Sequence, residues 1–225
     1  MVLIFQIIPI ILAMLFTLEA QAMQASTISS ANGDLVLFLK GEVTMDDSQK
    51  IILTLQSGNF SEIWLDSPGG DSAAGYKLGK AIREKRHLTR IPQGARCASA
   101  CVDVFLGGVI RFVDEKASLI IHPGSVSRSD QVNQYVHNAL RQGKGSEAIQ
   151  SVERLNSAET SLWIDYLLFM GVSSEIVAYA AEVPHDCGIV LNRKELVYFN
   201  ILNTSGQPAP GYKPSDPKIE CGFGR

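Results

Sequence analysis

The sequence has no excess of positive charge, and this absence narrows the functions to consider. Its 225 residues include 20 Lys and Arg against 23 Asp and Glu, which gives a formal charge of −3. Proteins that bind nucleic acid usually present a basic face, so nucleic acid is not an expected partner. Cysteine is also scarce, and the pair at Cys97 and Cys101 has no second pair nearby. We therefore expect no zinc site, no other metal and no cofactor.

The N-terminal segment lacks Lys and Arg but is strongly apolar. Residues 1–22 form an apolar run that ends in Ala-Gln-Ala at residues 20–22, the small-x-small pattern that signal peptidase reads. The apolar part, residues 2–18, is shorter than the roughly 20 residues that a membrane-spanning helix needs. We therefore expect a cleaved signal peptide and a periplasmic or secreted protein, with an uncleaved membrane anchor as the alternative.

Export would allow the four cysteines to form disulfides, because oxidising compartments permit them. Cys97, Cys101, Cys187 and Cys221 all lie in the mature part, and four cysteines allow three pairings. A bridge between Cys97 and Cys101 would clamp the turn that holds Ser99, and it works best if Cys97 lies in the turn before the following helix. The alternatives join these two cysteines to Cys187 or Cys221.

The mature sequence alternates short apolar strands with helices, which is typical of one α/β domain. Strands are expected at residues 35–39, 62–66, 88–93, 109–113 and 118–122. Helices are expected at residues 45–56, 72–85, 99–106, 132–140 and 146–170, followed by a short one ending at residue 181 and a last turn at 195–199. The predicted division is a signal peptide (1–22), one domain (23–202) and an irregular tail rich in Pro and Gly (203–225).

Three short segments hold the residues of a serine hydrolase site. Residues 67–70 (SPGG) follow a predicted strand, and their glycines can turn a backbone N–H into a cavity. Ser99 stands among small residues at the start of a predicted helix, where a serine is usually only a cap. His122 ends a predicted apolar strand, a place where a lone histidine is usually structural. Together, however, they could supply the nucleophile, base and oxyanion donors that acyl transfer needs.

In order and spacing, these motifs resemble the Clp protease proteolytic subunit (ClpP) family and its periplasmic ClpP-like relatives, within the crotonase superfamily. Gly70 precedes Ser99 by 29 residues (99 − 70), and His122 follows Ser99 by 23 (122 − 99). The form CASAC at residues 97–101 fits the periplasmic relatives better than the cytosolic protease. The resemblance implies a stack of β-β-α units with a helical arm. It also implies Ser99 as nucleophile, His122 as general base, and the N–H groups of Gly70 and Ala100 as the oxyanion hole.

The resemblance implies in addition an aspartate shortly before residues 191–195 (LNRKE). The family's spacing points to Gly188, so choosing Asp186 as the third triad member requires an offset of two residues. Asp165, inside the long predicted helix, is the weaker candidate because a solvated helical face suits it better. We expect Asp186 to complete the triad, while a Ser–His dyad could retain some activity.

The leading hypothesis is an exported serine endopeptidase that hydrolyses peptides or unfolded protein segments. No ATPase partner is expected, because there is no ATP pool outside the cytoplasm, and assembly of the family through its helical arms implies a homo-oligomer. One alternative is an inactive binding or scaffold protein in which Ser99 is a cap. A signal-peptide-peptidase-like enzyme would use a lysine base, which the motif segments lack. A crotonase-type enzyme would need coenzyme A thioesters, which export makes unavailable.

Overall fold

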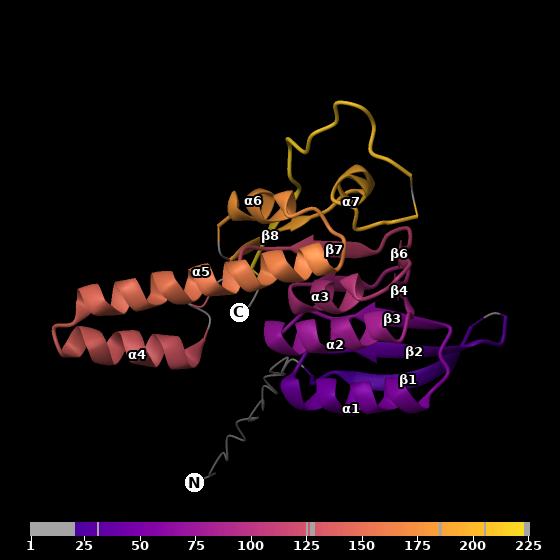
Figure 1. Cartoon of the computed structure of the whole chain (residues 1–225), viewed down its shortest axis with the longest axis horizontal. Coiled ribbons are helices and arrows are strands. Elements are labelled where there is room, and N and C mark those ends of the chain that lie inside the picture. Colours follow the sequence, from indigo (N-terminus) through magenta and orange to yellow (C-terminus); the bar gives the residue numbers. More distant parts are fainter. Residues whose placement is uncertain are drawn as a thin grey trace, which may run out of the picture.

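The described part of the chain forms two β-sheets with helices packed around them. The computed structural model describes residues 21–30, 32–124, 126, 129–184, 186–204 and 206–222. Its mixed α/β architecture confirms the predicted fold class (Figure 1). The predicted signal peptide lies outside the described residues except for its last two positions, 21 and 22. No helix within the described ranges is long and apolar enough to cross a membrane.

The first sheet is largely parallel and forms the base of the domain. Its strands, in spatial order, are β1 (Gln24–Ser29), β2 (Leu35–Lys40), β3 (Glu62–Asp66), β4 (Leu88–Ile91) and β6 (Arg111–Val113). The four strands from β2 to β6 run parallel, and β1 pairs antiparallel with β2 at the edge. The sequence analysis missed β1 because its side chains are polar and mostly exposed. Hydrogen bonding to β2, and not burial, holds this edge strand in place.

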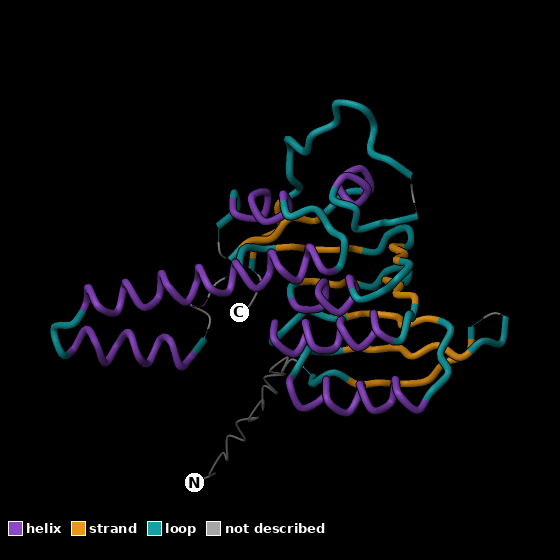
Figure 2. Tube along the Cα trace, viewed as in Figure 1, coloured by secondary structure: helices purple, strands orange, loops and turns teal. Residues whose placement is uncertain are grey.

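Three helices lie against this sheet, as Figure 2 shows. They are α1 (Met45–Ser57), α2 (Ser72–Glu84) and α3 (Ala100–Leu106). Side chains cap the first two helices, since Thr44 accepts a hydrogen bond from the Asp47 N–H and Asp71 accepts one from the Ala74 N–H. Both helices begin at the predicted residues, 45 and 72.

Helix α3 packs unusually close to α2 because glycines line the contact. A Cβ atom added to Gly75 would lie 2.8 Å from the Ala100 carbonyl oxygen and 3.3 Å from the Asp103 Cβ. A Cβ added to Gly79 would lie 2.6 Å from the Asp103 carbonyl oxygen. Any larger residue would push α3 outward. The glycines of α2 therefore fix the depth at which α3 sits.

The second sheet is smaller and carries the end of the chain. Its order is β5 (Arg96–Ala98), β7 (Ser118–Ile121), β8 (Cys187–Val190) and β9 (Ile219–Cys221). A disulfide joins Cys187 on β8 to Cys221 on β9. The tail was predicted to be irregular. Its end is ordered instead, because the disulfide and the pairing of β8 with β9 hold it in place. β5 was not among the expected strands, since the residues before Ser99 were predicted to form a turn.

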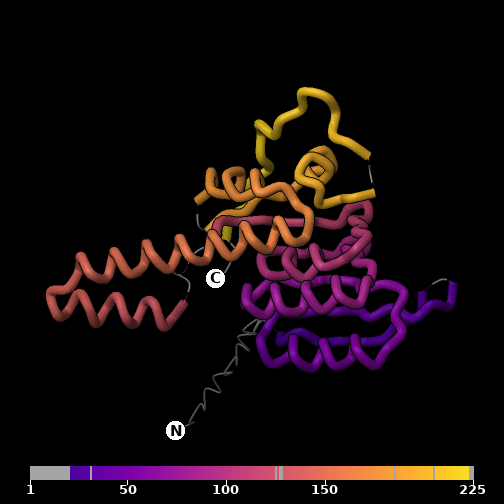
Figure 3. Tube along the Cα trace, in the orientation of Figure 1, coloured from indigo at the N-terminus to yellow at the C-terminus, as the bar shows by residue number. Residues whose placement is uncertain are grey.

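A hairpin of two helices extends from the body, and it confirms the predicted helical arm (Figures 1 and 3). It consists of α4 (Asp130–Arg141) and α5 (Gly145–Phe169). Gly171, with φ of +70°, ends the long helix. The inner part of α5 packs on the body, where Tyr166 and Leu167 are buried. Two short helices follow, α6 (Glu175–Ala181) and α7 (Arg193–Tyr198).

Candidate active site

Ser99 occupies a strained turn between β5 and α3. Its backbone angles are φ 55° and ψ −131°, a region that residues other than glycine rarely adopt. The Ser99 side chain makes no capping hydrogen bond to α3, so the interpretation of this serine as a helix cap is wrong. Backbone strain at a non-glycine residue gathers at functional sites. A serine on a sharp strand-to-helix turn is also the arrangement that exposes a nucleophilic hydroxyl.

Backbone hydrogen bonds bring the three predicted segments together around this turn. The Ser67 N–H donates to the Arg96 carbonyl (2.7 Å), and the Ala98 N–H donates to the Ser67 carbonyl (3.1 Å). The Ser99 N–H donates to the carbonyl of Ile120 on β7 (3.2 Å). The SPGG turn, the serine turn and the strand before His122 are thus neighbours in space, although they are separate in the sequence.

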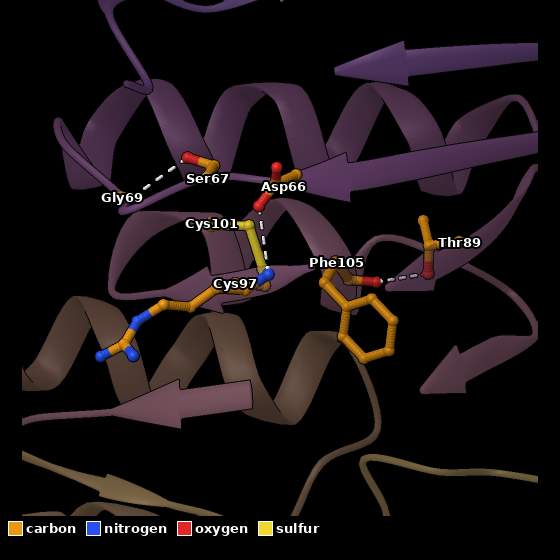
Figure 4. The surroundings of a disulfide bond; sticks show 8 residues. Asp66, Ser67, Gly69, Thr89, Cys97, Cys101 and Phe105 are labelled. Atoms are coloured by element: carbon orange, nitrogen blue, oxygen red, sulfur yellow. Dashed lines mark hydrogen bonds between the residues drawn. A yellow bond between two sulfur atoms is a disulfide. The ribbon is translucent and has the colours of Figure 1, made fainter. Parts of the chain in front are cut away.

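A buried disulfide joins Cys97 on β5 to Cys101 on α3, across Ser99. The Cα atoms lie 5.3 Å apart and both side chains are fully buried. Figure 4 shows this bridge beside the turn that contains Ser67 and Gly69. Of the three pairings left open by the sequence, the structure therefore has Cys97 with Cys101 and Cys187 with Cys221. Such bridges are compatible with an extracellular or periplasmic protein.

Removing the clamp should weaken both the fold and the site. We expect the double variant Cys97→Ala/Cys101→Ala to lose about 2 kcal/mol of unfolding free energy, the chain-entropy value for so short a loop. Because Ser99 lies between the two anchors, its reactivity toward an active-site probe should fall as well. Urea unfolding and labelling rates under folded conditions measure the two effects.

The matched control is the double variant Cys187→Ala/Cys221→Ala, whose bridge lies between β8 and β9 and outside the serine turn. This control should also lose stability, yet the protein that remains folded should keep its labelling rate. Equal losses of labelling rate in both double variants would contradict a local role for the clamp.

The SPGG turn packs directly against the serine turn through Gly69. A Cβ atom on Gly69 would lie 2.5 Å from the Ser99 Cβ and 3.1 Å from the Ala100 nitrogen, so only glycine fits at this position. The Gly69 N–H donates a hydrogen bond to the Ser67 hydroxyl oxygen at 3.1 Å. Within the described residues, the N–H groups of Gly70 and Ala100 donate to no protein acceptor. Ala100 lines the same cavity as Ser99, whereas Gly70 is not among the lining residues of that cavity.

His122 lies directly after β7 and lines the same cavity as Ser99. Its Nδ1 is 2.8 Å from the carbonyl oxygen of Pro123. A carbonyl can only accept a hydrogen bond, so this contact places the ring proton on Nδ1 and the lone pair on Nε2. That tautomer is the one a general base needs when Nε2 takes the proton of a serine.

Asp186, in contrast, is not brought to the cavity. The register of β7 with β8 pairs Ile121 with Ile189, and extending it by one residue places Gly188 opposite His122. Asp186 lies two residues before Gly188, and it is exposed. The position from which an acid would face the ring is therefore occupied by glycine. Asp165 is likewise exposed, on α5. The carbonyl of Pro123 contacts Nδ1 of His122.

The cavity beside Ser99 has a volume of about 50 Å³ and lies between α2, α3, the end of β7 and the inner part of α5. Tyr76, Asp103, Glu159 and Trp163 are among the lining residues that the sequence analysis missed. Asp103 left a signal, since it is a lone carboxylate in the apolar helix ACVDVFL, one turn after Ser99. Glu159 and Trp163 lie on α5, far from the motifs in the sequence, and Tyr76 lies on α2, six residues after Gly70 (76 − 70). Only the fold brings these side chains to one cavity.

Two carboxyl groups shape the electrostatics of this cavity. Burial, together with the nearby charge of Glu159, raises the pKa of Asp103 well above its ordinary value, while a hydrogen bond from Trp163 acts in the opposite direction. Burial, with the charges of Asp103 and Glu159, also raises the pKa of the Tyr76 hydroxyl. That hydroxyl donates to Glu159 at 3.5 Å. The inner wall therefore combines the carboxyl group of Glu159 with a buried acid, Asp103, whose ionisation is unfavourable while no cation is near.

The raised pKa of Asp103 predicts a pH-dependent stability. In the pH range between the ordinary value of 3.8 and the raised one, the folded chain holds a proton that the unfolded chain has lost. Stability should therefore fall as the pH rises through this range. The variant Asp103→Asn removes this slope and should be at least as stable as the native protein at neutral pH. Urea unfolding from pH 4 to pH 8 measures the slope, and an identical slope in both proteins would contradict the prediction.

Comparisons with known proteins leave the family of this chain open. No protein-family model and no curated protein matches the sequence. Among solved structures, the fold is similar to that of a mutant of ClpP1 from Listeria monocytogenes, at 18% sequence identity and a TM-score of 0.47. The match covers 75% of this chain and 88% of that one.

Proposed function

We propose that this protein is an exported serine peptidase with Ser99 as its nucleophile. The observation that carries the proposal is the strained backbone of Ser99, at φ 55° and without a capping bond, in a cavity that it shares with His122. A turn that served only to begin a helix would be more stable with glycine, so the strain at a serine favours chemistry at its hydroxyl.

The presence of Ser99 and His122 in one cavity supports an acyl-enzyme mechanism. The Ser99 oxygen attacks the peptide carbonyl, while Nε2 of His122 takes the hydroxyl proton. The N–H groups of Gly70 and Ala100 hold the oxyanion. The C–N bond then breaks as His122 gives the proton to the leaving amine, and water releases the acyl group by the reverse proton path. Asp186 is given no step, because its carboxylate is exposed and the Pro123 carbonyl already orients the ring.

The proposal includes the place of action and the assembly. Residues 1–22 would direct export, leaving a domain at 23–202 and a tail at 203–225, and the two disulfides are compatible with an oxidising compartment. Because such a compartment has no ATP pool, the enzyme would act on peptides and unfolded segments without an ATPase. The helical arm carries exposed apolar residues, among them Leu140, Ile149 and Leu155. This surface supports a homo-oligomer formed through the arms.

Labelling with a fluorophosphonate tests the proposal. Protein produced from the full chain by export should react covalently, and peptide mass spectrometry should place the adduct on Ser99. Heating the protein above its unfolding transition should abolish the reaction, because the turn and the base are then lost. Absence of labelling in folded, disulfide-bonded protein would overturn the proposal and favour the scaffold interpretation.

A further inference from the structure

The wall of the cavity next to Ser99 carries two carboxyl groups that come from different helices. Asp103 lies one helical turn after Ser99 on α3, only 5% exposed, and lines the cavity. Glu159 lines it from α5, on the helical arm. Residues one turn apart share a helical face, so Asp103 lies on the same face of α3 as Ser99.

Neither carboxyl group has a cationic side chain as its partner in the described part of the protein. None of the ion pairs among the described residues involves Asp103 or Glu159. Their polar neighbours are Trp163, which donates to Asp103, and the hydroxyl of Tyr76, which donates to Glu159. Glu159 is only partly buried, whereas Asp103 is deeply buried, and the ionisation of a buried carboxyl group without a cation is costly. A cation that entered this cavity would favour the ionised form of Asp103, so a positively charged occupant would gain an ion pair that the cavity lacks without it.

We propose, on the basis of the peptidase function above, that this cavity selects substrates with a cationic side chain, lysine above all, at the residue whose carbonyl Ser99 attacks. Once that residue is bound to Ser99 as an acyl group, its Cα is two bonds from the Ser99 oxygen. Its side chain is therefore the one nearest to the cavity. The ammonium group would meet Asp103 and Glu159, in the way that a carboxylate at the base of a specificity pocket selects a basic residue.

The size and the walls of the cavity fit a slender chain. A volume of about 50 Å³ has room for roughly three to five water molecules, and so for the end of an unbranched side chain. Tyr76 and Trp163 supply aromatic walls for methylene groups, and aromatic faces also attract an ammonium ion. A bulky aromatic residue would not enter without moving α5. Shape and charge therefore favour the same ligand.

A matched pair of covalent probes tests the selection. We would use two peptidyl diphenyl phosphonates that differ only at the residue next to phosphorus, with lysine in one and norleucine in the other. The two side chains have similar length and shape, so the ratio of their labelling rates reports the ammonium group. We expect the lysine probe to label Ser99 at least about tenfold faster, a discrimination of about 1.4 kcal/mol. Stronger labelling by the norleucine probe, or equal rates, would overturn the selection.

Variants locate the selection in the cavity. Asp103→Asn and Glu159→Gln should each lower the lysine-to-norleucine ratio several-fold, whereas Glu153→Gln, an exposed residue on the same helix α5, should leave it unchanged. A ratio that stays constant in both cavity variants would contradict the role of the two carboxyl groups. Glu159→Gln keeps the test valid if Asp103→Asn folds poorly.

Labelling with the simple fluorophosphonate distinguishes the proposed peptidase function from the proposed selectivity for lysine. It carries no peptide side chain and reports the nucleophile alone. If it labels Ser99 while the lysine probe shows no advantage, the peptidase function stands and the inferred selectivity is wrong. If no probe labels Ser99, the function fails and the selectivity fails with it.

Discussion

The variant Ser99→Ala is expected to lower kcat/KM for a peptide substrate by a factor of at least about 10³, because loss of a serine nucleophile removes the whole acyl-enzyme route. His122 and the oxyanion donors would remain, but no group in the described cavity replaces the hydroxyl at the strained turn. Hydrolysis of a fluorogenic peptide with lysine before the scissile bond measures the loss. The exposed serine variant Ser57→Ala, at the end of α1, is the matched control and should keep full activity.

A second substitution at the same position separates catalysis from folding. Glycine adopts the φ of 55° found at Ser99 without steric cost. We therefore expect Ser99→Gly to be as inactive as Ser99→Ala but more stable than the native protein, by about 1 kcal/mol. Urea unfolding compares the three proteins. Retained peptidase activity in either variant would rule out Ser99 as the nucleophile, and a less stable glycine variant would contradict the strain at this turn.

The sequence predicted the parts of the fold that bury apolar side chains with a regular period. β2, β3, α1, α2 and the helical arm all appear near their expected residues, because alternation and helical periodicity report burial directly. β1 could not be predicted this way, since its mostly exposed residues are held only by pairing with β2. The tail strand β9 depends on the partner of Cys221, and the sequence left three pairings of the cysteines open.

Local sequence motifs predicted one part of the candidate site. Ser99, His122 and the SPGG turn follow short apolar strands, and strand pairing brings them together. Asp186 was expected beside His122, but the register of β7 with β8 puts Gly188 opposite His122. Strand pairing sets this register, and motif spacing does not report it. The acids of the cavity come from α3 and α5, and their proximity depends on how deeply α3 packs against the glycines of α2. No local sequence pattern predicts how closely α3 packs against α2.

The second large effect is expected at Arg111, which is fully buried at the start of β6. Its guanidinium donates to five backbone carbonyls, those of Leu106, Gly108, Met170, Asn200 and Ile201. Burial and the neighbouring Arg83 lower the pKa of Arg111 to about 10, so it is still charged at neutral pH. Since each buried carbonyl left without a partner costs roughly 1–3 kcal/mol, Arg111→Met should lose at least about 3 kcal/mol of unfolding free energy.

Loss of the Arg111 guanidinium should also disturb the candidate active site. Leu106 ends α3 and Met170 follows the end of α5, so the guanidinium ties together the two helices that carry Asp103 and Glu159. Arg111→Lys keeps the charge but not the planar set of donors, and it should fall between the native protein and the methionine variant. The exposed substitution Arg154→Met on α5 is the control and should change stability by less than about 0.5 kcal/mol. If Arg111→Met were as stable as this control, Arg83, which donates to three of the same carbonyls, would suffice to hold the two helices.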